Sequence, residues 1–94
     1  MGAVMFACSK AGHDKGRIYA VAGSSGDKVL LCDGDKRPLE RPKAKNAKHI
    51  QIIRNLPEEI VSMCEQNGKL YNEGIKRALK QYTLKRLEES DVKG

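Results

Sequence analysis

The chain has 94 residues, of which 39% are hydrophobic and 32% are charged. This composition is typical of one small globular domain and excludes a disordered chain, and the length excludes a large enzyme core. The formal net charge of +6 lies entirely in residues 1–55, and residues 36–54 carry most of their cations. Such a concentrated charge favours binding to a polyanion, although a solvated basic loop explains the charge alone equally well.

Five short strands are predicted in the first part of the chain, at residues 3–9, 16–23, 28–33, 36–40 and 49–53. They have apolar or alternating patterns and are separated by turn sequences such as Asp33-Gly34-Asp35. The spacing leaves no room for helical crossovers. We therefore predict a mainly β fold, a small five-stranded closed barrel, with an open three-stranded meander packed on C-terminal helices as the alternative.

Two helices are predicted after the strands. Asn55 is expected to cap the first helix, Pro57 suits its first turn, and Asn67-Gly68 ends it. The second helix is expected over residues 70–88, with an apolar stripe in which Gly74 indicates close packing or a kink. Residues 91–94 are expected to fray. The predicted organisation is a barrel at residues 1–54 and a helical extension at residues 55–94.

Gly12 and Gly16 bracket a basic turn between the first two strands. A Walker phosphate loop has four residues between its glycines and then Lys-Ser/Thr, so this spacing excludes one. We expect a turn at the barrel mouth that displays four side chains toward a polyanion; an ordinary turn with incidental charges is the alternative. The four residues are Lys10, His13, Lys15 and Arg17.

A second basic segment runs from residue 36 to residue 49 and is stiffened by Pro38 and Pro42. Its lysines suit backbone phosphates, and its arginines suit phosphates or bases. Aromatic side chains are too scarce to predict base stacking, so recognition of structured RNA through its backbone fits better. The candidate RNA-binding residues of this segment are Lys36, Arg37, Arg41, Lys43, Lys45, Lys48 and His49.

Other kinds of site have little support in the sequence. The acids of the first part fall mainly in turns and no nucleophile has a nearby histidine, so no catalytic residue is predicted. Cys8, Cys32 and Cys64 are too far apart for a zinc knuckle and are expected to be free thiols, as in a reducing cytoplasm. No apolar segment is long enough for a signal or a membrane span. We expect a cytoplasmic protein with no cofactor, metal, membrane contact or small-molecule substrate.

Two stretches of the chain resemble a known family. SKAGHDKGRIYAV (9–21) resembles the KOW motif, and VLLCDGDKRPLERPKAKNAKHIQI (29–52) resembles its continuation in large-subunit ribosomal proteins of the archaeal and eukaryotic KOW class. Among bacterial proteins the chain is most similar to the short KOW-domain RNA-binding proteins of Gram-positive species. The resemblance covers residues 3–53. It implies an SH3-like barrel that binds ribosomal or other structured RNA, with Gly12 and Gly16 shaping the turn.

The resemblance also implies which of the basic residues face RNA. These are Lys10, Lys15, Arg17, Lys43, Lys45, Lys48 and His49. The expected function is therefore RNA binding in translation, on the ribosome or on ribosomal RNA. The alternative is a protein-interaction adaptor in translation or transcription, in which the apolar helix faces around Ile75 and Leu79 bind partners such as ribosomal proteins.

Overall fold

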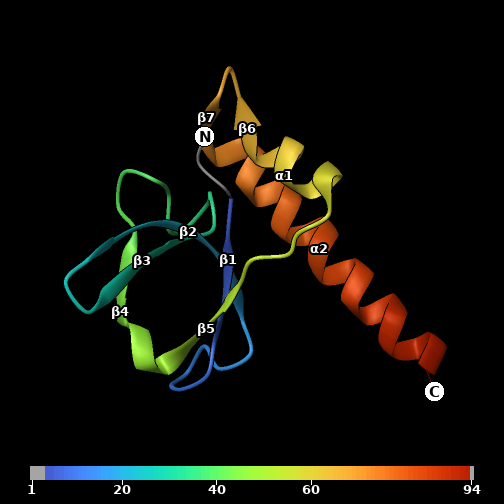
Figure 1. The fold of residues 1–94 in the computed structure, drawn as a ribbon, viewed down its shortest axis with the longest axis horizontal. Coiled ribbons are helices and arrows are strands. Elements are labelled where there is room, and N and C mark those ends of the chain that lie inside the picture. Colours follow the sequence, from blue (N-terminus) through green and yellow to red (C-terminus); the bar gives the residue numbers. More distant parts are fainter. Residues whose placement is uncertain (1–3, 94) are drawn as a thin grey trace.

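The computed structural model describes residues 4–93, with side chains described through residue 87, and shows a five-stranded antiparallel sheet followed by two helices (Figure 1). A short 3₁₀ turn, η1, joins the last two strands of the sheet, and a two-residue hairpin joins the helices. The elements are β1 (Phe6–Ser9), β2 (Ile18–Ser25), β3 (Lys28–Cys32), β4 (Lys43–Asn46), η1 (Ala47–His49), β5 (Ile50–Ile53), α1 (Glu58–Cys64), β6 (Glu65–Gln66), β7 (Lys69–Leu70) and α2 (Asn72–Lys93).

The sheet is strongly curled. Its strand order is β4-β3-β2-β1-β5, so β4 and β5 form opposite edges. In a flat sheet these edges would lie about 19 Å apart, at about 4.8 Å per strand. Only the three residues of η1 separate Asn46 from Ile50, and four Cα steps span at most about 15 Å. The edges are therefore drawn together at this end, although no ladder joins β4 to β5 within residues 4–93.

The two faces of the sheet carry separate apolar clusters. Phe6, Ala20 and Cys32 lie on the face that packs against the helices. Ala7, Tyr19 and Leu31, which are their neighbours along the same strands, form a smaller cluster on the other face. This follows from the alternation of side chains along a strand. In β2, Ile18, Ala20 and Ala22 belong to the first cluster and Tyr19 and Val21 belong to the second.

The helices complete the larger cluster, as the apolar stripes predict. Ile60 and Cys64 of α1 and Ile75 and Ala78 of α2 are fully buried there. The rings of Phe6 and Tyr82 form a T-shaped pair with a centroid distance of 5.4 Å. The sheet and the two helices therefore share one core. Within residues 4–93, no helix is both long enough and apolar enough to cross a bilayer.

Three local predictions are wrong. The first helix ends at Cys64, so Asn67-Gly68 does not end it and instead forms the turn between β6 and β7, where both residues have a positive φ. The fourth strand is Lys43–Asn46, because residues 36–40 form bends and a turn in which the Asp33 carboxylate accepts backbone N–H bonds from Asp35 and Arg37. Asn55 does not cap α1, since Pro57 holds the cap position and no side chain bonds there. The second helix begins at Asn72 and its backbone continues to Lys93. The side chains of residues 91–93 and the whole of Gly94 lie outside the described residues, and the fraying expected for residues 91–94 concerns this part of the chain.

Gly74 lets α2 pack closely against α1, one of the two outcomes expected for this position. A Cβ here would collide with the Met63 carbonyl oxygen and the Tyr71 ring. We expect Gly74→Ala to lower the free energy of unfolding by about 1–3 kcal/mol through overpacking, although alanine favours a helix by about 1 kcal/mol. Urea denaturation measures this, with exposed Gln81→Ala as the control. A Gly74→Ala variant more stable than wild type would contradict the close packing.

Candidate nucleic-acid interface

A hollow of about 870 Å³ opens between the turn after β1, the loop after β3 and strand β4. Six cationic residues and two carboxylates line it, which gives a formal charge of +4 with histidine neutral. It contains seven of the eleven side chains predicted from the sequence to bind RNA. These seven are His13, Lys15, Arg17, Lys36, Arg37, Lys43 and Lys45.

The Asp14 carboxylate organises one side of this hollow. It accepts hydrogen bonds from Lys43 Nζ at 2.8 Å, from Lys45 Nζ at 2.7 Å, from Ser9 Oγ at 2.8 Å and from the Tyr19 hydroxyl at 2.9 Å. Only 11% of its side chain is exposed. The two ammonium groups, aided by the two hydroxyls, hold the pKa of Asp14 well below its usual range, although partial burial opposes this. Asp14 is therefore ionised at physiological pH and fixes both lysines.

The ammonium group of Lys45 makes its hydrogen bonds within the protein. Its ammonium group donates to Asp14 Oδ1, to Ser9 Oγ at 2.8 Å and to the Ala11 carbonyl at 2.7 Å. Its side chain is only 13% exposed. An ammonium group has three donors, so these bonds use all of them. Lys45 thus ties strand β4 to the turn after β1, and Lys43 presents the more accessible ammonium group.

Asp33 organises the opposite side of the hollow. Its Oδ2 atom accepts a bond from Arg17 Nη2 at 3.0 Å, and its Oδ1 atom accepts the backbone N–H groups of Asp35 and Arg37, both at 2.9 Å. Asp33 is buried, and these bonds tie the start of the following loop to its carboxylate. That loop presents the side chains of Lys36 and Arg37 to the hollow.

Tyr19 lies at the base of the hollow, and two cations lie over its ring. The guanidinium carbon of Arg17 is 5.4 Å from the ring centroid and the Lys43 ammonium is 5.9 Å from it, both within cation–π range. Burial, with a smaller effect of Asp14, raises the pKa of the Tyr19 hydroxyl. The hydroxyl therefore remains a hydrogen-bond donor to Asp14, and the buried ring supports the cations rather than offering a face for base stacking.

Three of the lining cations have no side-chain partner within the described part of the chain. Lys15, Lys36 and Arg37 are exposed, and among these residues their side chains make no ion pair or hydrogen bond. Gly12 and Gly16 have φ values of +88° and +89°, a conformation that glycine adopts without steric cost. The turn between them brings Lys15 to the rim of the hollow. These three cations are available to bind an external anion.

Four of the predicted residues lie outside the lining of the hollow. Lys48 and His49 are exposed on η1, and the Lys10 backbone N–H bonds to the His49 carbonyl at 2.8 Å, so these three lie together at one end of the sheet. Arg41 lies in the loop before β4 and is exposed. The structure therefore divides the predicted set into the hollow, a neighbouring group at η1 and an isolated Arg41.

Sequence reasoning missed the residues that organise the hollow: Ser9, Asp14, Tyr19 and Asp33. The sequence pattern places Asp14 and Asp33 in turns, where aspartate is common. Lys43 and Lys45 are two apart on a strand and so share a face, which points to a shared partner. That signal is visible only once their segment is known to be a strand rather than a loop.

The other candidate features give no second chemical site among the described residues. Ile75 and Leu79, the helix residues expected to bind partners in an adaptor, are buried in the core. All three cysteines are free thiols, and burial raises the pKa of Cys32 and of Cys64 to about 11. Within residues 4–87, no group of three histidine, cysteine or acidic side chains could hold a metal ion.

Comparison with models of known protein families and with curated protein sequences finds no match for this chain.

Proposed function

We propose that this chain binds structured RNA, ribosomal RNA in particular, through the phosphate backbone. The observation that carries the proposal is the hollow, in which cations from three separate segments converge and three of them have no partner within the described residues. Lysine and arginine side chains at the surface bind phosphates without reading sequence. The aromatic rings in the lining of the hollow are the buried ring of Tyr19 and the exposed imidazole of His13, with no tryptophan or phenylalanine among the lining residues. This favours recognition of shape and backbone rather than of unpaired bases.

The fold we propose is an SH3-like barrel of the KOW class. Two observations support it: the resemblance of residues 3–53 to KOW sequences, and the curl of the sheet that brings its edge strands β4 and β5 together through η1. In this proposal the contacting residues are Lys15, Arg17, Lys36, Arg37 and Lys43, whereas Lys45 positions the turn. The three free thiols support a reducing compartment, which we take to be the cytoplasm.

The test is RNA affinity as a function of salt, measured by fluorescence anisotropy with a labelled ribosomal RNA hairpin. Contact with about five phosphates predicts a slope of log K against log salt of about −3.5 to −4.5. Lys36→Glu/Arg37→Glu should weaken binding at least tenfold at about 0.1 M salt and should reduce the slope by about 1.8. Sedimentation of the tagged wild type with large ribosomal subunits then tests whether ribosomal RNA is the ligand.

The matched control is Arg54→Glu/Lys69→Glu. Both residues are exposed and lie outside the hollow, and the double change alters the net charge by the same amount. We expect this control to retain most of the affinity. If the two variants lose affinity equally, the protein responds only to net charge and the hollow is not the site. Equal affinity for a DNA duplex of the same length would indicate a general polyanion binder.

A further inference from the structure

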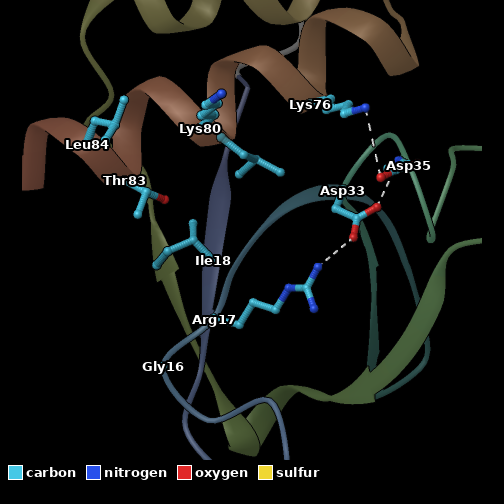
Figure 2. A pocket seen from close by; sticks show the side chains of 10 residues that line it. Gly16, Arg17, Ile18, Asp33, Asp35, Lys76, Lys80, Thr83 and Leu84 are labelled. Carbon is cyan, nitrogen blue, oxygen red and sulfur yellow. Dashed lines mark hydrogen bonds and ion pairs between the residues drawn. The ribbon is translucent and has the colours of Figure 1, made fainter.

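A groove runs along α2 and adjoins the hollow, with which it shares Arg17 and Asp33 (Figure 2). It consists of two adjoining cavities of about 420 Å³ and about 240 Å³, which share Gly16, Ile18 and Thr83. The start of β2 forms one wall and α2 forms the other. Figure 2 shows Lys76, Lys80, Thr83 and Leu84 of α2 along one side of this groove, with Ile18 and Arg17 across from them.

The groove carries an apolar surface that no described residue covers. Leu84 and Leu87 are 46% and 58% exposed, and they are the exposed large hydrophobic side chains of residues 4–87. They are three residues apart on α2, so they share a helix face. Leu84 lines the larger cavity with Ile18 and Leu79, and Leu87 lines the smaller one. Ile18 and Leu79 extend this apolar strip toward the core.

The charge around the strip is positive. The cations of α2 that line the groove are Lys76, Lys80 and Arg86, whereas Lys85 lies outside the lining and pairs with Glu59 at 2.6 Å. The two acids in the groove have partners, since Asp33 bonds to Arg17 at 3.0 Å and Asp35 lies 3.9 Å from Lys76. Lys80 has no ion pair within the described residues. A second copy of this chain would place like charges face to face, which disfavours self-association through α2.

We infer that this groove binds an acidic amphipathic helix of another protein. Apolar residues at a spacing of three and four on such a helix would cover Leu84, Leu87 and Ile18, and its acids would meet Lys80 and Arg86 at the rim. From Lys76 to Leu87 the groove follows α2 for about 16 Å, at about 1.5 Å per residue, which matches about three helical turns of a partner. This binding does not depend on RNA, and RNA phosphates would leave the leucines exposed.

The test uses the full-length protein and a phage-displayed library of random peptides about 16 residues long. Peptides selected by wild type should be acidic, with apolar residues at helical spacing. One selected peptide, titrated into ¹⁵N-labelled protein, should shift the amides of Gly16, Ile18, Thr83 and Leu87. Leu84→Gln/Leu87→Gln should weaken it at least tenfold, and Lys80→Glu should weaken it with a shallower salt dependence. Circular dichroism checks that each variant folds.

Two controls separate this interaction from charge and from RNA binding. Leu84→Met/Leu87→Met keeps the apolar area and should retain affinity, and Lys28→Glu makes the same charge change at an exposed site outside the groove. The inference is overturned if the library yields no peptide that discriminates wild type from Leu84→Gln/Leu87→Gln, if selected peptides lack acids, or if they shift hollow residues instead. Shifts in the groove caused by the RNA hairpin and not by any peptide would also overturn it. Loss of RNA binding with intact peptide binding would refute only the proposed function.

Discussion

Asp14→Asn is expected to lower the free energy of unfolding by about 2–3 kcal/mol at neutral pH. The substitution removes the one carboxylate that bonds to both Lys43 and Lys45, and it leaves two neighbouring ammonium groups without this counter-charge. Lys45 cannot easily turn to solvent, because its other donors are held by Ser9 and Ala11. Urea denaturation of the purified variant measures the loss.

The same carboxylate makes stability depend on pH. The pKa of Asp14 is lower in the folded protein than in the unfolded chain, where aspartate has a pKa of about 3.9. Its pairing therefore stabilises the fold at higher pH, and the contribution shrinks as pH falls below about 4. Asp14→Asn should lose this part of the acid sensitivity. Asp27→Asn, at an exposed turn, is the matched control and should keep the wild-type profile.

Phe6→Ala is expected to lower the free energy of unfolding by about 3–5 kcal/mol, more than Asp14→Asn or Gly74→Ala. Phe6 is fully buried between the sheet and α2 and meets the Tyr82 ring at an interplanar angle of 83°. Its removal opens a cavity at the contact that joins the helices to the sheet. Phe6→Leu, which keeps most of the volume, should cost less than about 1.5 kcal/mol.

The number of unfolding transitions of the Phe6→Ala variant tests whether the helices fold independently of the sheet. Because the helices and the sheet share one core, we expect a single transition in urea when helical circular dichroism and tyrosine fluorescence are followed together. Two separated transitions, with the helical signal unaffected by Phe6→Ala, would show that residues 55–94 form an independent unit.

The elements that can be predicted from the sequence are those in which burial of one face makes apolar residues recur at a regular spacing. β1 to β3, β5 and both helices follow apolar alternation or a three-and-four stripe, and their predicted positions agree with the structure to within a few residues. Strand β4 has no such signal, because its sequence, Lys-Ala-Lys-Asn, has no apolar period. Pairing with β3 and the ion pairs of its lysines with the partly buried Asp14 carboxylate make it a strand. A long-range partner of this kind leaves no local pattern.

The candidate site can be predicted only in part, because its ion pairs also join residues that are far apart in the sequence. Residue type and net charge point to two basic segments, and seven of the predicted side chains in them line one hollow. Which cations are free and which are already paired depends on Asp14 and Asp33. Asp33 meets Arg17 at the end of the β2–β3 ladder, whereas Asp14, in the turn between β1 and β2, reaches Lys43 and Lys45 of β4 across the curled sheet. The sequence contains those aspartates but not the distances that decide their role.

The carboxylates of Asp14 and Asp33 affect which anions the hollow would bind: small anions with one phosphate or polymers with many. A free phosphate or a mononucleotide that binds at Lys43 or Arg17 would have to compete with Asp14 or Asp33 for that cation. A single small anion gains little from that exchange, because one ion pair replaces another. A polymer can hold Lys15, Lys36 and Arg37 simultaneously, and the linked contacts raise the effective concentration of each further phosphate. If the hollow binds RNA as proposed, Asp14 and Asp33 would favour nucleic-acid chains over small anions of the cell.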